Sequence, residues 1–380
     1  MISQGWADLA QRARPVAVRS RRAPDDGAGS YAPSADDAFR VGMLIPMSGA
    51  AGLWGPSCLA SATLATEDWN RAGGHHGRCV RLVVVDASDE SASLEDDVED
   101  VTAQGGVTAM VGMHTSSVRE RITRVLDGRL PLVYTPLYEG GPLPSNVMAI
   151  GETPDDQLLP ALAWLGARYR LTRWYLLGND YRWPRRTHAL ASEALASAGC
   201  EVRGSRFVPL GACDAERTVD EIRRSGAQAV LLSLVGQDAV EFNRAFGACG
   251  LGARILRLSC AIEENGLLAM GPDCTDGLFV AAGYFARLGT DRNHAFRERY
   301  WTRFGDRAPA LNALGQSTYE GVSFLRALLS GTRRRGAEVE FASVRGTRWR
   351  SNADKATPIY LAQAEGLALR VVRGLTRMVS

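Results

Sequence analysis

The feature that most constrains the fold is a unit that recurs from residue 39 onward: a short apolar run, a turn, and an amphipathic helical pattern. Four such apolar runs lie in the first part of the chain, at residues 39–46, 80–88, 107–113 and 130–136. They are continuous rather than alternating, which is typical of strands buried on both faces of a sheet. Alternation of strand and helix at this spacing predicts a doubly wound parallel sheet.

The pattern restarts after residue 150, which predicts a second α/β domain with a boundary near residues 150–160. Its expected strands are residues 173–180, 202–210, 227–236, 254–260 and 276–285. Two further helical patterns, at 294–305 and 311–330, precede a polar, strand-like tail from about residue 338. We expect this tail to return to the two earlier domains, so that the chain crosses between them more than once.

The overall composition argues against several classes of partner. A net charge of only +2 gives no reason to expect nucleic acid or an anionic membrane as the main partner. The sequence contains no run of about 20 apolar residues, so no membrane span is expected. The seven cysteines form no CxxC pair, which argues against a zinc site or a thioredoxin-type redox site.

The first 37 residues differ in composition from the rest of the chain. Arginines interrupt every apolar stretch, and Pro, Gly, Ser and Asp follow, so we expect a disordered N-terminal tail over residues 1–37. No secretory signal or lipid-attachment cysteine is visible in it. The expectation is therefore a cytoplasmic location with reduced thiols, or an extracytoplasmic one if the start is misassigned.

Candidate binding residues follow from the rule that ligands bind outside the carboxyl ends of the strands in open α/β sheets. The segments at those ends are residues 46–55, 114–117, 134–141, 179–184, 236–238, 260–264 and 284–285. They are rich in hydroxyls and aromatic rings and contain few unpaired charges. Such a lining suits a small neutral or weakly polar ligand.

Each candidate also has an interpretation without function. Ser116 and Ser117 suit the cap of a helix that begins there, and Tyr134 and Tyr138 suit a core. A lone His114 is typical of a packed or surface histidine, and the dipole of a helix favours a glutamate at its start.

Enzyme signatures are missing from the sequence. It has no GxSxG elbow, no phosphate-binding GxxxxGK[ST] loop, no HExxH pair and no GxGxxG after the first strand. The residues alone therefore indicate a two-domain binding protein that is not an enzyme and needs no cofactor or metal.

A family resemblance then emerges from seven segments in order. These are "IPMSGAAGLWG", "WNRAGG", "VGMHTSSVR", "YTPLYEG", "SNVMAIGETPDDQ", "YLLGNDYRWPR" and "YF". Together they resemble the type I periplasmic-binding-protein family, which is Leu/Ile/Val-binding-protein-like, over roughly residues 39 to 375. "YEG" followed by "SN" and then "DYRWPR" is most similar to the amide/urea branch, which includes urea-transporter receptors and the amide sensor of amidase operons.

The resemblance implies two Rossmann-like lobes with parallel sheets, joined by three crossovers that act as a hinge. The expected division is lobe 1 at 38–157 plus 286–335, and lobe 2 at 158–285 plus 336–380. It also implies a ligand in the cleft between the lobes. The residues expected to line that cleft are Thr115, Ser116, Tyr134, Thr135, Tyr138, Tyr181, Trp183, Ser233 and Gly236.

Two roles are possible for Glu139 near this cleft. Its carboxylate could accept hydrogen bonds from the hinge or from N–H groups of the ligand. The expected ligand is a short-chain amide or a urea-like molecule.

Two functions follow from this resemblance. One is an intracellular sensor whose ligand-dependent closure changes its affinity for a regulatory protein, with a homodimer as one compatible assembly. The alternative is the substrate-binding receptor of an ABC transporter for amides, urea or branched-chain amino acids, with a permease as its partner. The absence of a visible export signal favours the sensor.

Overall fold

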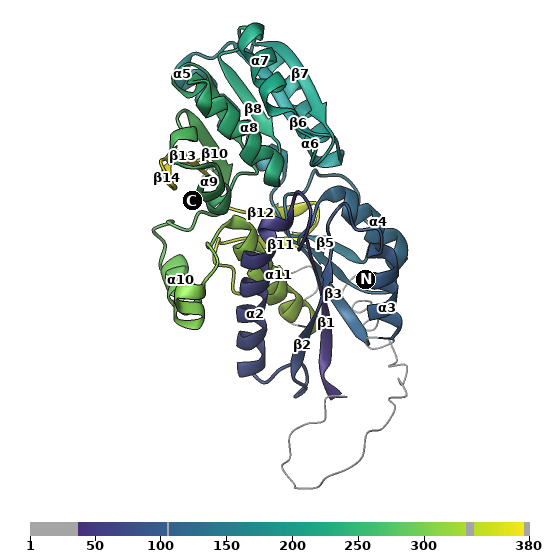
Figure 1. Ribbon diagram of the computed structural model, residues 1–380. Coiled ribbons are helices and arrows are strands. Elements are labelled where there is room, and N and C mark those ends of the chain that lie inside the picture. The colour runs from purple at the N-terminus through teal and green to yellow at the C-terminus, as the bar shows by residue number, and fades with distance from the viewer. Residues whose placement is uncertain (1–36, 105, 332–337, 376–380) are drawn as a thin grey trace.

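The computed structural model describes residues 37–104, 106–331 and 338–375. Their chain forms two α/β lobes, drawn one above the other in Figure 1, with helices on both faces of each sheet. The predicted N-terminal tail, apart from Asp37, lies outside the described residues. Each helix among the described residues is too short or too polar to cross a bilayer.

The first lobe contains a five-stranded sheet in the order β2-β1-β3-β4-β5, and all its strand pairs are parallel. The strands are β1 (Phe39–Ile45), β2 (Val80–Asp86), β3 (Val107–Gly112), β4 (Leu132–Tyr134) and β5 (Val147–Ala149). The helices are η2 (Gly52–Trp54), α2 (Gly55–Arg71), α3 (Leu94–Ala103), α4 (Ser116–Leu126), α10 (Asp291–Phe304), η5 (Gly305–Arg307) and α11 (Ala313–Leu329). The central strands β1 and β3 are buried almost throughout, which explains their continuous apolar sequences.

Helix α11 returns to this lobe from far along the chain and packs beside α2 (Figure 1). The hydroxyl of Tyr319 donates to Asp68 at 2.8 Å. Gly315 allows the close approach of the two helices, because a Cβ there would lie 2.9 Å from the carbonyl oxygen of Ser57.

The second lobe contains a seven-stranded sheet in the order β14-β13-β10-β9-β8-β6-β7. Its strands are β6 (Arg173–Asn179), β7 (Glu201–Val208), β8 (Ala229–Ser233), β9 (Leu256–Ser259), β10 (Leu278–Ala282), β13 (Tyr360–Glu365) and β14 (Ala368–Gly374). Its helices are α5 (Pro154–Tyr169), α6 (Arg182–Ser197), α7 (Ala215–Ser225), α8 (Gly236–Ala248), η3 (Leu251–Ala253), α9 (Glu264–Met270) and η4 (Pro272–Cys274). Strands β6 to β10 pair in parallel, and β13 and β14 add an antiparallel edge. The predicted two-lobe α/β fold with parallel sheets is confirmed.

The tail differs from the expected division, which assigned all of residues 336–380 to lobe 2. Strands β11 (Arg348–Ser351) and β12 (Asp354–Ala356) form a small separate sheet beside β5. Trp349 donates its indole N–H to the carbonyl oxygen of Ala149 at 3.1 Å, and Asn352 donates to that of Val147 at 2.8 Å. Because β5 is the edge of the first sheet, its backbone groups need such partners. Only from β13 onward does the tail join the second sheet.

Three segments of the described chain connect the lobes: β5 to α5, β10 to α10, and β12 to β13. They meet at Gly283, where an added Cβ would lie 2.0 Å from Oε1 of Glu152 and 2.8 Å from the methyl group of Thr357. The hinge is therefore a crowded point at which a methyl group on residue 283 would force the side chains of Glu152 and Thr357 to shift.

Candidate ligand-binding cleft

A small cavity of about 60 Å³ lies between the two lobes and is lined by both of them and by the hinge. The first lobe contributes the segments that follow β1, β3 and β4, and the start of α11. The second lobe contributes the segments that follow β6, β8 and β9. The cavity thus lies at the carboxyl ends of the parallel strands, where the switch-point rule places ligands.

Six of the nine expected site residues line this cavity, and three do not. The six are Thr115, Ser116, Tyr134, Thr135, Tyr181 and Trp183. The three outside its lining are Tyr138, Ser233 and Gly236.

The start of α4 connects the lobes through Ser116. Its hydroxyl oxygen accepts a hydrogen bond from the backbone N–H of Trp183 in the other lobe, at 3.2 Å. The cap of α4 is the preceding residue, since Thr115 accepts from the backbone N–H of Val118 and donates to Asp89 at 2.8 Å. The hydroxyl of Thr115 is thus already bonded inside its own lobe.

The two tyrosines of the loop after β4 have different positions. Tyr134 borders the cavity, and its hydroxyl donates to the carbonyl oxygen of His114 at 3.1 Å. Tyr138 turns away from the cavity because its hydroxyl donates to the carbonyl oxygen of Gly141. The ring of Tyr138 lies 4.9 Å from Nζ of Lys355, beside the hinge. The expectation that Tyr138 lines the cleft is therefore corrected.

Glu139 forms part of a buried ion pair rather than the cavity wall. Its carboxylate accepts from Arg119 of the same lobe, and both side chains are 2% exposed. Arg182 of the second lobe also approaches it, with its Nε 3.0 Å from Glu139 Oε1. The hydrogen bonds of Glu139 thus come from Arg119 of its own lobe, and Arg182 adds an ion pair from the other lobe.

Ser233 and Gly236 lie beside the cavity without lining it. Ser233 is the last residue of β8 and is buried. Gly236 has a φ of +56°, and a Cβ there would lie 2.1 Å from the carbonyl oxygen of Ala50. This glycine therefore allows the lobes to approach each other, and the neighbouring Val235 contacts the cavity instead.

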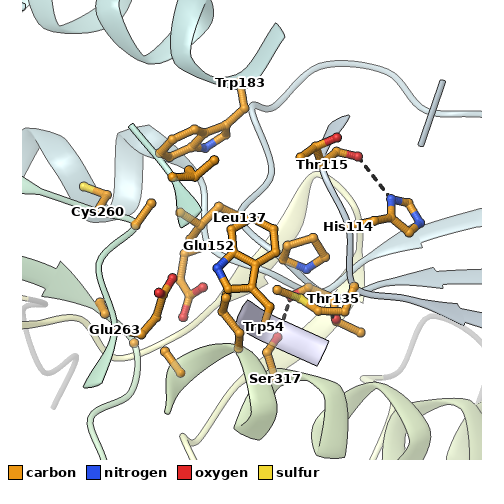
Figure 2. Close-up of a pocket in the computed structure, with 18 of the residues that line it drawn as sticks. Trp54, His114, Thr115, Thr135, Leu137, Glu152, Trp183, Cys260, Glu263 and Ser317 are labelled. Carbon is orange, nitrogen blue, oxygen red and sulfur yellow. Dashed lines mark hydrogen bonds between the residues drawn. The ribbon is translucent and has the colours of Figure 1, made fainter. Parts of the chain in front are cut away.

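Two tryptophans from opposite lobes dominate the cavity wall, as Figure 2 shows. Trp54, which ends η2, and Trp183, in the first turn of α6, are 5% and 4% exposed. The indole N–H groups of both side chains are buried without a hydrogen-bond partner among the described residues. Unsatisfied buried donors carry an energetic cost, so both indoles are candidates to donate to an acceptor that enters the cavity.

Sequence reasoning did not single out Trp54. It lies inside the candidate segment 46–55, but a tryptophan in a glycine-rich loop has no periodicity to show where its ring points. Its place in the cavity depends on the packing of η2 against α2 and α8.

Two carboxyl groups also line the cavity: Glu152 from the hinge and Glu263 from the second lobe. Burial, followed by repulsion from Glu264, raises the pKa of Glu263 to about 8. Glu152 accepts from Arg345 at 2.6 Å. Figure 2 shows the indole nitrogen of Trp54 turned toward the side where Glu152 and Glu263 lie.

The cations near the cavity are already engaged. Arg345 is buried and donates to Glu152, to Gln316 at 2.6 Å and to the carbonyl oxygen of Ala313 at 2.9 Å. Burial lowers the pKa of His114 to about 4, so this imidazole is neutral at pH 7. The expected packed histidine is found here, with a ring that Figure 2 shows turned away from the cavity centre.

The family can now be stated. Residues 38–366 match the family described as Periplasmic binding protein, so the chain belongs to this family.

Solved structures of similar fold cover nearly the whole described chain. One is an ABC transporter solute-binding protein from R. palustris in complex with 4-hydroxybenzoate, with 16% identity, 90% and 99% coverage of this chain and that one, and a TM-score of 0.75. Another is a branched-chain amino acid transporter substrate-binding protein from Streptococcus pneumoniae in complex with isoleucine, with 15% identity, 88% and 99% coverage, and a TM-score of 0.73.

A third is an ABC transporter substrate-binding protein from Sphaerobacter thermophilus, with 21% identity, 89% and 97% coverage, and a TM-score of 0.72. At these identities the likeness concerns the fold. The amide/urea branch stays a prediction, since the ligands named in these structures are a benzoate and an amino acid.

Proposed function

We propose that the protein is a solute-binding receptor of the ABC-transporter type that encloses one small uncharged ligand, a short-chain amide or urea, between its lobes. The observation that carries the proposal is the pair of partnerless indole N–H groups, one from each lobe, in one small buried cavity. A ligand oxygen between them would satisfy donors that only the closed arrangement brings together. Such a ligand binds the closed form better than the open one and shifts the population toward it.

The charge of the lining supports a neutral ligand. The guanidinium of Arg345 is neutralised by Glu152, and His114 is uncharged at pH 7. Glu263 adds a carboxyl rather than a cation. A carboxylate ligand such as a benzoate or an amino acid would therefore find no free cation among the described lining residues, which costs free energy in a buried site.

An amide supplies the complementary groups. Its carbonyl oxygen accepts from an indole N–H, and its N–H groups donate to a carboxyl oxygen of Glu152 or Glu263. Hydrogen bonds with both ends of a polar ligand discriminate strongly, because an analogue that lacks one of them leaves a buried group unpaired.

The transport role is preferred to sensing because the relatives of similar fold are named as ABC transporter proteins. The sensing role and the cytoplasmic location stay predictions from the sequence.

The test is calorimetric titration of the full chain with acetamide, propionamide, urea, sodium benzoate and isoleucine. We expect an amide or urea to bind and benzoate and isoleucine not to bind. A ligand at 100 times its Kd adds about 2.7 kcal/mol to the free energy of unfolding, which a thermal melt detects.

A pair of variants makes the test specific to the cavity. Trp183→Phe removes one cavity donor and should weaken amide binding. Trp174→Phe changes another buried tryptophan of the same lobe, which lies outside the cavity and whose indole N–H also has no partner in the described part of the chain, and it should leave binding unchanged. Binding of benzoate or isoleucine without any amide or urea would overturn the ligand assignment.

A further inference from the structure

Trp54 is anchored in the first lobe by its backbone. Its N–H donates to the carbonyl oxygen of Ala51 at 3.0 Å, and its carbonyl oxygen accepts from the hydroxyl of Ser57 at 3.1 Å. That hydroxyl in turn accepts from the side chain of Asn312, the cap of α11, at 2.9 Å. The position of the indole is therefore set by α2 and α11, not by a free loop.

The second lobe holds the same turn from the other side. The backbone N–H of Gln237 donates to the carbonyl oxygen of Ala50 at 2.8 Å. The side chain of Asn265 donates to the carbonyl oxygen of Leu53 at 3.1 Å. With hydrogen bonds from both lobes on the residues that flank it, Trp54 has little room to swing out of a closed cleft.

The indole occupies the middle of the site. Figure 2 shows it among the lining side chains, between Trp183 and Ser317 and beside Leu137. The space that remains is about 60 Å³. An apolar protein cavity of about 150 Å³ is known to accept benzene, so a ligand with a six-membered ring exceeds what this cavity offers.

We propose that Trp54 is the specificity-determining residue that limits the ligand to a short open chain and excludes aromatic amides. This inference rests on the proposed function, since it concerns the ligand of the same cavity. Removing the indole joins its volume to the existing cavity and opens the site to a ring, as cavity-creating substitutions do in apolar sites. It also removes one of the two indole donors.

The experiment compares acetamide and benzamide as ligands of the wild-type chain, Trp54→Ala and Trp54→Phe, by calorimetric titration. We expect the wild type to bind acetamide at least tenfold more tightly than benzamide. In Trp54→Ala the order should reverse, with benzamide gaining at least tenfold and acetamide losing at least tenfold. Trp54→Phe keeps a ring but lacks the N–H, so acetamide binding should weaken without a gain for benzamide.

Trp174→Phe is the matched control, and its preference should equal that of the wild type. Thermal melts verify that each variant folds, and if Trp54→Ala does not, Trp54→Leu takes its place. The proposal is overturned if the wild type binds benzamide as tightly as acetamide, or if the enlarged variant gains no benzamide binding while still binding acetamide. If no variant binds any amide, the proposed function fails first and this inference falls with it.

Discussion

Glu263 shows how a single side chain in the cleft links stability to pH. Burial and then the neighbouring Glu264 raise its pKa from 4.5 to about 8, whereas the unfolded chain exposes an ordinary carboxyl. Between about pH 5 and pH 8 the folded state therefore holds a proton that the unfolded state has lost. The free energy of unfolding should fall as the pH rises through this window.

The substitution Glu263→Gln should flatten that dependence and raise the stability at pH 8, because an amide needs no proton to stay neutral. Urea denaturation at several pH values from 5 to 8.5 measures the slope. A residual slope is expected from Glu264, whose pKa burial raises to about 7. The exposed Glu193→Gln serves as control, and an equal slope in the wild type and Glu263→Gln would contradict the argument.

Part of the site was predictable at the residue scale. Hydroxyl and aromatic residues that follow apolar strand runs, such as Ser116, Tyr134 and Trp183, reach the cavity because parallel strands end at one edge of a sheet. Tyr138 shows the limit of the rule. It lies in the correct loop, but its ring is buried in the core of the first lobe and its hydroxyl bonds to Gly141, and no spacing in the sequence encodes that bond.

At the scale of elements, α6 contributes a contact that spans the lobes. Arg182, in its first turn, lies 2.8 Å from Glu120 of α4 and 3.0 Å from the buried Glu139. Both acidic groups belong to the first lobe, whereas Arg182 belongs to the second. This contact exists only when the lobes are closed, so it adds to the free energy of closure.

Arg182→Ala should shift the ligand-free chain toward the open form. Arg182 is half-exposed and Glu139 keeps its pair with Arg119, so the loss should be about 1 kcal/mol, which corresponds to roughly a fivefold change in the closure equilibrium. Small-angle scattering should show a larger radius of gyration for the variant. Arg185→Ala is the matched control, because Arg185 pairs with Asp180 inside its own lobe at 2.6 Å and should leave the radius unchanged. Identical radii for the two variants would refute a closing role for Arg182.

At the scale of the whole molecule, the alternating pattern was enough to predict two parallel α/β sheets. Strands buried on both faces have continuous apolar sequences, and the helices between them have amphipathic sequences. The path of the tail was not predictable in the same way. Residues 348–356 attach to β5 through the side chains of Trp349 and Asn352, and such contacts leave no periodic signal.

The crossing point of the chain provides the last test. The hinge brings the three crossovers so close at Gly283 that a methyl group there would collide with Glu152, the partner of the buried Arg345. Relief requires the ion pair to move, and disruption of a buried pair costs about 3 kcal/mol or more. Gly283→Ala should therefore lower the free energy of unfolding by about that amount, measured by urea denaturation.

The control is Gly289→Ala in the same crossover, where an added Cβ would meet open space. It should change the free energy of unfolding by well under about 1 kcal/mol. Equal stabilities for the two variants would mean that the crossovers yield at this point and that Glu152 keeps its ion pair with Arg345 beside the added methyl group.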